Sequence, residues 1–79
     1  MKSMYMPLSM LSEGESGIIV DIRGGRGLVR RLLELGFTPG TRVKVLKMSP
    51  PGPVLVEIRE SRIALGRGVA MKVLVEVVR

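Results

Sequence analysis

Residues 41–59 read TRVKVLKMSPPGPVLVEIR and carry the clearest indication of the fold. In residues 41–48 the valines alternate with charged side chains, and in residues 54–59 Val54, Val56 and Ile58 again fall at every second position. An alternation with period two is typical of a β-strand that buries one face. Proline and glycine separate the two runs. The stretch therefore predicts two strands joined by a loop.

Three further apolar runs extend this pattern on either side. They cover residues 17–23, 63–65 and 71–78, and the last of them again alternates. Residues 17–23 carry apolar side chains on both faces, so we assign them no inward face. A tight turn at Glu60-Ser61 leads into the strand at 63–65. Short strands separated by ten glycines and five prolines are typical of a small all-β sandwich or barrel, here with five strands.

One segment departs from the β pattern. In residues 27–35, Leu28, Leu32 and Leu35 recur at i, i+4 and i+7, which predicts a helix with one apolar stripe. Gly36 can adopt the left-handed conformation that ends many helices. We therefore expect one helix of about two turns between the first two strands.

Two short features and a core complete the predicted architecture. Residues 38–41 read TPGT, which predicts a type II turn. We expect residues 9–12 to form a helical turn with Ser9 as its N-cap. The strand and helix phases predict that four apolar residues are buried, namely Leu32, Val43, Val56 and Val73.

Composition excludes most enzyme classes. The chain has 79 residues, of which 46% are hydrophobic, and it contains neither Cys nor His. Without Cys the chain can have no thiolate metal site, disulfide or cysteine nucleophile. Without His it lacks the commonest general base. The seven carboxylates are scattered without a ligand pattern: Glu13, Glu15, Asp21, Glu34, Glu57, Glu60 and Glu76. We therefore expect no catalytic residues, no metal site and no cofactor.

Length and hydropathy patterning predict one cytoplasmic domain. A domain over residues 1–79 fits the usual size range, and we expect residues 1–6 to be frayed. The longest aliphatic runs are far shorter than the roughly 20 residues of a membrane-spanning helix. No run near the start is long enough for a signal peptide.

The densest charge lies at residues 23–27, RGGRG, followed by Arg30 and Arg31. The formal net charge of +6 favours anionic surroundings. A glycine-rich loop before a helix could hold a phosphate, and an Arg-Gly-Gly element could touch RNA. The third interpretation is a strand-to-helix turn with solvated arginines. Single-stranded nucleic acid also requires aromatic stacking platforms, and the chain offers only Tyr5 and Phe37.

Taken in order, several motifs resemble the ferrous iron transport protein A (FeoA) family. The match runs from about residue 7 to residue 77, and its most recognisable part is RLLELGFTPG at residues 31–40. The other matching segments are PLSML at 7–11, GESG at 14–17, SPPGP at 49–53 and IAL at 63–65. The resemblance implies a mainly β fold: a small five-stranded SH3-like barrel with one short inserted α-helix.

The resemblance also implies a function. It indicates a small cytosolic accessory or regulatory protein of bacterial ferrous iron uptake, which binds the cytoplasmic GTP-binding part of an FeoB-type membrane permease. Such a protein is peripheral to the membrane through its partner. Transition metal ion binding is implied only for the family, and no metal residue carries over. The alternative is a basic small barrel that binds nucleic acid, although we expect no specific nucleic acid partner. The sequence leaves homo-oligomer formation open.

A single-domain binding protein is expected to present an apolar patch with a charged rim. The candidates are apolar residues whose phase points away from the core, exposed loop prolines and nearby cations. They are Arg26, Arg30, Arg31, Leu33, Phe37, Pro50, Pro51 and Leu74. Alternatively, Leu33 and Phe37 seal the helix against the barrel.

Overall fold

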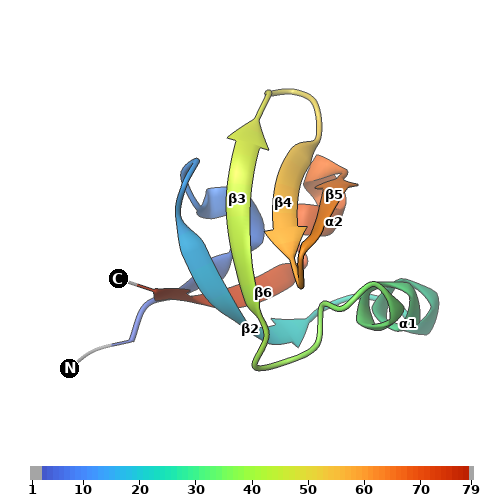
Figure 1. The fold of residues 1–79 in the computed structure, drawn as a ribbon. Helices are drawn as coiled ribbons and strands as arrows, with labels where there is room; N and C mark the ends of the chain where they lie inside the picture. Colours follow the sequence, from blue (N-terminus) through green and yellow to red (C-terminus); the bar gives the residue numbers. More distant parts are fainter. Residues whose placement is uncertain (1–2, 79) are drawn as a thin grey trace.

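The computed structural model describes residues 3–78 as one antiparallel sheet with short helical insertions (Figure 1). The strand order is β1-β6-β2-β3-β4-β5. The predicted mainly β class is confirmed. In chain order the elements are β1 (Tyr5–Pro7), η1 (Leu8–Met10), β2 (Ser16–Ile22), α1 (Arg26–Glu34), β3 (Arg42–Met48), β4 (Val54–Ile58), β5 (Ser61–Leu65), α2 (Arg67–Ala70) and β6 (Val73–Val78).

The sheet has six strands, so the predicted number of five was wrong. The additional strand, β1, pairs Tyr5 with Glu76 and Pro7 with Leu74. Proline is tolerated there because β1 lies at the edge of the sheet and needs no ladder hydrogen bond on its free side. Tyr5 and Met6 are therefore not frayed as predicted, whereas residues 1 and 2 lie outside the described residues.

Two other local predictions need correction, and one short helix was missed. The helical turn near the start is a 3-10 helix that begins at Leu8, with Pro7 rather than Ser9 at its N-cap position. The β4–β5 hairpin turns at Arg59 and Glu60, both with positive φ, one residue earlier than predicted, because Ile58 pairs with Ser61. The short helix α2 was not predicted, since its four residues are too few to show a period.

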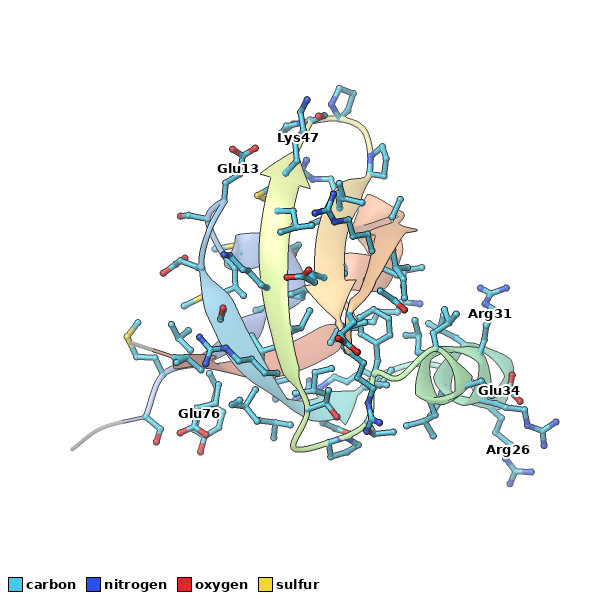
Figure 2. All side chains as sticks on the ribbon, viewed as in Figure 1. Glu13, Arg26, Arg31, Glu34, Lys47 and Glu76 are labelled. Atoms are coloured by element: carbon cyan, nitrogen blue, oxygen red, sulfur yellow. The ribbon has the colours of Figure 1, made fainter. Side chains whose placement is uncertain are left out.

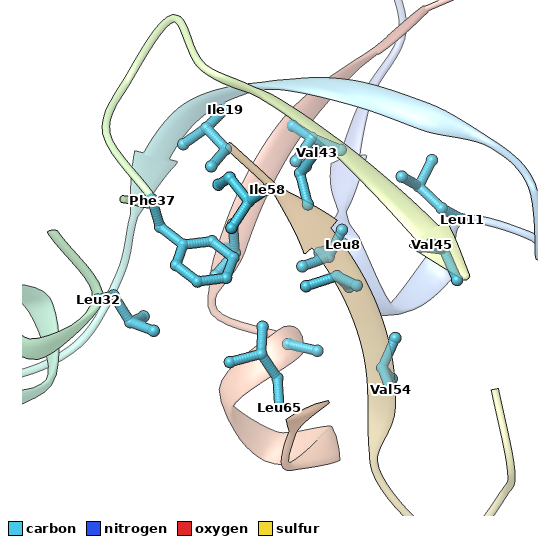
Figure 3. Close-up of a cluster of buried hydrophobic side chains, with 14 residues drawn as sticks. Leu8, Leu11, Ile19, Leu32, Phe37, Val43, Val45, Val54, Ile58 and Leu65 are labelled. Atoms are coloured by element: carbon cyan, nitrogen blue, oxygen red, sulfur yellow. The ribbon is translucent and has the colours of Figure 1, made fainter. Parts of the chain in front are cut away.

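The sheet curves around a core that draws on almost every element (Figure 3). Each of the four residues predicted to be buried, Leu32, Val43, Val56 and Val73, is at most 2% exposed. The other buried hydrophobic residues are Leu8, Leu11, Ile19, Phe37, Val45, Val54, Ile58, Leu65, Ala70 and Val75. Alternation along β3, β4 and β6 places their buried valines on one side, which is why a period of two located this core.

Helix α1 ends as its sequence predicts. Gly36 has φ +106, and its N–H donates to the Leu33 carbonyl at 3.0 Å. The Phe37 N–H donates to the Leu32 carbonyl at 2.9 Å. These two hydrogen bonds form a Schellman motif, which turns the chain back so that Phe37 packs beside Leu32 (Figure 3). The predicted type II turn follows, with Gly40 at φ +91 and the Thr41 N–H donating to the Thr38 carbonyl.

Candidate docking surface

Helix α1 extends from one end of the barrel (Figure 1). Leu32 is the buried residue of the helix, and Leu28 packs partly against the core. Leu35 was predicted to share this stripe but is 44% exposed. It occupies the C-cap position, where the chain has already begun to leave the helix. The other sides of α1 are therefore open.

An open groove of about 570 Å³ lies along the outward side of α1. We call it the α1 groove, and it is lined by Gly24, Arg26, Val29, Arg30, Leu33 and Glu34. Val29 and Leu33 are four residues apart, so they lie one turn apart on the same side of the helix. Arg26 and Arg30 form a parallel row by the same spacing. The groove therefore combines an apolar strip with a cationic margin.

The loop before α1 shapes one end of this groove. Residues 23–25 connect β2 to α1, and Gly24 has φ +138 while Gly25 occupies the N-cap position. Residues 23–25 therefore form a strand-to-helix turn, a geometry shared by the phosphate-binding and the solvated-arginine interpretations. The Arg23 N–H donates to the Lys72 carbonyl at 2.7 Å, which ties the turn to the start of β6.

Three of the eight predicted docking residues come together in the α1 groove: Arg26, Arg30 and Leu33. Arg31 is exposed but points away from Arg26 (Figure 2), and it does not line the groove. Sequence reasoning missed Gly24, Val29 and Glu34 as lining residues. Because Val29 precedes Leu33 by one turn, helical spacing could have identified it.

The other predicted residues lie elsewhere. Phe37 is 0% exposed, so its assignment to a docking surface was wrong. The Schellman motif directs it into the core, as the alternative interpretation held. Pro50 and Pro51 are exposed on the β3–β4 loop, at the opposite end of β3 from α1 (Figure 1). Leu74 is half-buried on β6, opposite Pro7 and Asp21.

Two carboxylates have structural roles. The Glu13 Oε2 accepts a hydrogen bond from the Met48 N–H at 2.7 Å, and the Glu15 Oε1 accepts one from the Ser12 N–H at 2.7 Å. Both fasten the loop between η1 and β2. Within residues 3–78, no three Asp or Glu side chains gather where they could hold a metal ion. In the same range, no helix has the length and apolar character needed to span a bilayer.

A family model, the FeoA domain, matches residues 6–77, from β1 through β6. This chain belongs to the FeoA family. A protein of Methanocaldococcus jannaschii that is named as an Fe(2+) transport protein A is 41% identical over 70 residues. The alignment covers 89% of this chain and 84% of that protein. The resemblance drawn from the sequence is confirmed, and so is the association of the family with ferrous iron transport.

A second FeoA relative is part of a larger protein. The Fe(2+) transport protein A/Fe(2+) transporter FeoB fusion protein of Porphyromonas gingivalis is 37% identical over 75 residues. This alignment covers 92% of the present chain but 9% of the fusion protein. The FeoA sequence therefore occupies a small part of a polypeptide that also contains FeoB.

Solved FeoA structures share the fold. The crystal structure of an iron uptake regulatory protein, FeoA, matches with a TM-score of 0.89 and 37% identity, covering 95% of this chain and 100% of that one. Stenotrophomonas maltophilia FeoA, solved with zinc, matches with a TM-score of 0.79 and 32% identity, covering 89% of this chain and 88% of that one. That protein is described as a prokaryotic SH3 domain protein, and the predicted SH3-like class is confirmed.

Proposed function

We propose that this chain is a non-enzymatic accessory protein of ferrous iron uptake that binds an FeoB-type permease on its cytoplasmic side. The observation that carries this proposal is the fusion of a related FeoA sequence to FeoB in one polypeptide of Porphyromonas gingivalis. Joining two modules by a short linker raises their effective concentration, to about millimolar. Where the two are separate chains, a binding surface has to supply the same proximity.

The α1 groove is the docking surface that we propose for this partner. Leu33 is 39% exposed at its centre, and the Arg26 and Arg30 guanidinium groups flank it. Binding interfaces commonly have an apolar centre, and arginine is frequent among the residues that contribute most binding energy. The matching partner is a segment of the permease that presents apolar side chains beside carboxylates. The net charge of +6 accelerates its encounter with such an acidic segment.

Two single substitutions test this surface against the full permease in lipid nanodiscs. Leu33→Glu places a charge in the apolar strip, and Arg30→Glu reverses the charge of the margin. We expect each to weaken binding at least about tenfold, because residues at the centre of an interface commonly contribute more than about 1.4 kcal/mol. Arg67→Glu is the matched control, since Arg67 is exposed on α2 and does not line the groove.

Circular dichroism and the thermal midpoint establish that each variant is folded. If both folded variants bind as tightly as the unmodified chain, the α1 groove is not the docking surface. If the unmodified chain itself does not bind the permease, the proposed partner is wrong.

A further inference from the structure

A second hollow, on the outward face of the sheet, has a different character from the α1 groove. It measures about 390 Å³, which is within the usual range for sites that hold small molecules. It shares no lining residue with the α1 groove. We call it the outer-face hollow. Its polar lining residues are Ser16, Arg42, Lys44, Glu57, Arg59 and Glu60.

Strand register brings three of these residues into one row. Ser16 on β2 lies opposite Lys44 on β3, and Lys44 lies opposite Glu57 on β4. Directly opposite residues have their Cβ atoms about 4.5–5.5 Å apart. The neighbouring valines of β3 and β4 are buried in the core, so this row faces outward. The Ser16 hydroxyl and the Lys44 ammonium group therefore belong to one small region.

Ser16 is unusual among the described residues. It is the buried polar residue of residues 3–78, with 7% of its surface exposed, and it lines the hollow. Its hydroxyl makes no hydrogen bond to any residue that the structure describes. No buried side-chain oxygen or nitrogen among residues 3–78 lacks a hydrogen-bond partner, so the Ser16 hydroxyl is open to the hollow rather than sealed in the core. A ligand in the hollow can therefore reach this hydroxyl and accept its hydrogen bond.

The charges around the hollow favour an anionic ligand. Three lining residues are cationic and two are acidic. Arg62 lies opposite Glu57 on the side away from Lys44 and adds a positive charge beside that carboxylate. The cations therefore outnumber the carboxylates around the hollow, and a concave surface with an excess of one charge concentrates ions of the opposite sign.

We propose that the outer-face hollow binds a small organic anion through a phosphate or carboxylate group. The Ser16 hydroxyl donates a hydrogen bond to an oxygen of this group. The Lys44 ammonium and the Arg42 guanidinium provide charge-assisted hydrogen bonds, of which the arginine can form two in parallel. The remaining volume accommodates the rest of a small molecule.

Amide NMR spectra of the ¹⁵N-labelled chain test this proposal with inorganic phosphate and acetate as separate probes at constant ionic strength. We expect saturating shifts at Ser16 and Lys44 with at least one probe. Lys44→Gln should weaken that binding by about tenfold or more, and Ser16→Ala should weaken it as well. Lys72→Gln is the matched control, because Lys72 is an exposed lysine outside the hollow. The spectra also show whether each variant is folded.

The two probes distinguish the source of the oxyanion. Saturation by phosphate alone supports a phosphorylated ligand, saturation by acetate alone supports a carboxylate ligand, and saturation by both supports general oxyanion binding. The proposal is overturned if neither probe saturates, if the shifts spread evenly over exposed cationic residues, or if Lys72→Gln weakens binding as much as Lys44→Gln does.

Discussion

Leu32 and Leu33 are neighbours on α1 with identical side chains and opposite surroundings. Leu32 is 2% exposed and packs with Phe37 in the core, whereas Leu33 is 39% exposed and lines the α1 groove. Successive residues of a helix are rotated by about 100°, which is enough to move a side chain from the barrel to solvent. Stability and the proposed binding therefore depend on different sides of one short helix, and we expect substitutions to alter them separately.

The largest expected effect is the loss of stability in Leu32→Ala. This change leaves a cavity beside Phe37 and should lower the free energy of unfolding by about 2–5 kcal/mol. The same truncation in Leu33→Ala should cost no more than about 0.5 kcal/mol, because its side chain is partly solvated. Denaturant unfolding of the two variants measures the difference. A thermal midpoint of Leu32→Ala within one degree of the unmodified chain would show that the inward side of α1 is wrongly assigned.

The next largest expected effect is on stability, and it differs between glycines at the two ends of α1. Gly36 has φ +106, and a Cβ there would meet the Arg59 side chain at 3.2 Å. Gly36→Ala should therefore lower stability by about 1–2 kcal/mol, the cost of left-handed backbone for a residue with a Cβ. Gly27→Ala is the matched control: a Cβ at Gly27 meets nothing within 4 Å, and alanine favours the helix by up to about 1 kcal/mol. Equal losses in thermal melts of both variants would contradict the proposed role of the Schellman motif.

Local patterns predicted the inward side of the sheet and the buried leucine of α1. Alternation located Val43, Val56 and Val73, because side-chain direction in a strand depends only on the position along that strand. Strand β1 could not be predicted in this way. Tyr5–Pro7 is too short to show a period, and it exists through pairing with β6 at the other end of the chain.

The residues of the proposed docking surface could be predicted only in part, for a similar reason. Arg26, Arg30 and Leu33 share a side of one helix, and helical spacing is local information. Pro50 and Pro51 were grouped with them by residue type, but the path of β3 places them at the far end of the barrel (Figure 1). The direction of the Phe37 side chain depends on the two hydrogen bonds of the Schellman motif at the C-terminal end of α1.

A smaller effect tests whether the outward cations of α1 act on nucleic acid. We expect only weak binding that involves about two phosphates, at Arg26 and Arg30. Its affinity should fall roughly tenfold between about 50 and 200 mM salt, because each neutralised phosphate releases counterions. Fluorescence anisotropy with a labelled RNA measures this dependence, and Arg26→Gln with Arg30→Gln should remove most of it. A nanomolar complex with a defined RNA at about 150 mM salt would instead support the nucleic-acid function.

The smallest expected effect is that of ferrous iron on the isolated chain. The sequence contains no Cys or His, and Glu34 is the carboxylate that lines the α1 groove. A single carboxylate is a poor site for a divalent cation, since oxygen-only sites use several ligands. Glu13 and Glu15 already accept backbone hydrogen bonds, which an ion would have to displace. Anaerobic calorimetry should therefore detect no binding tighter than millimolar. One micromolar site that Glu34→Gln abolishes would place iron on the docking side of α1 and would overturn its assignment as a purely protein-binding surface.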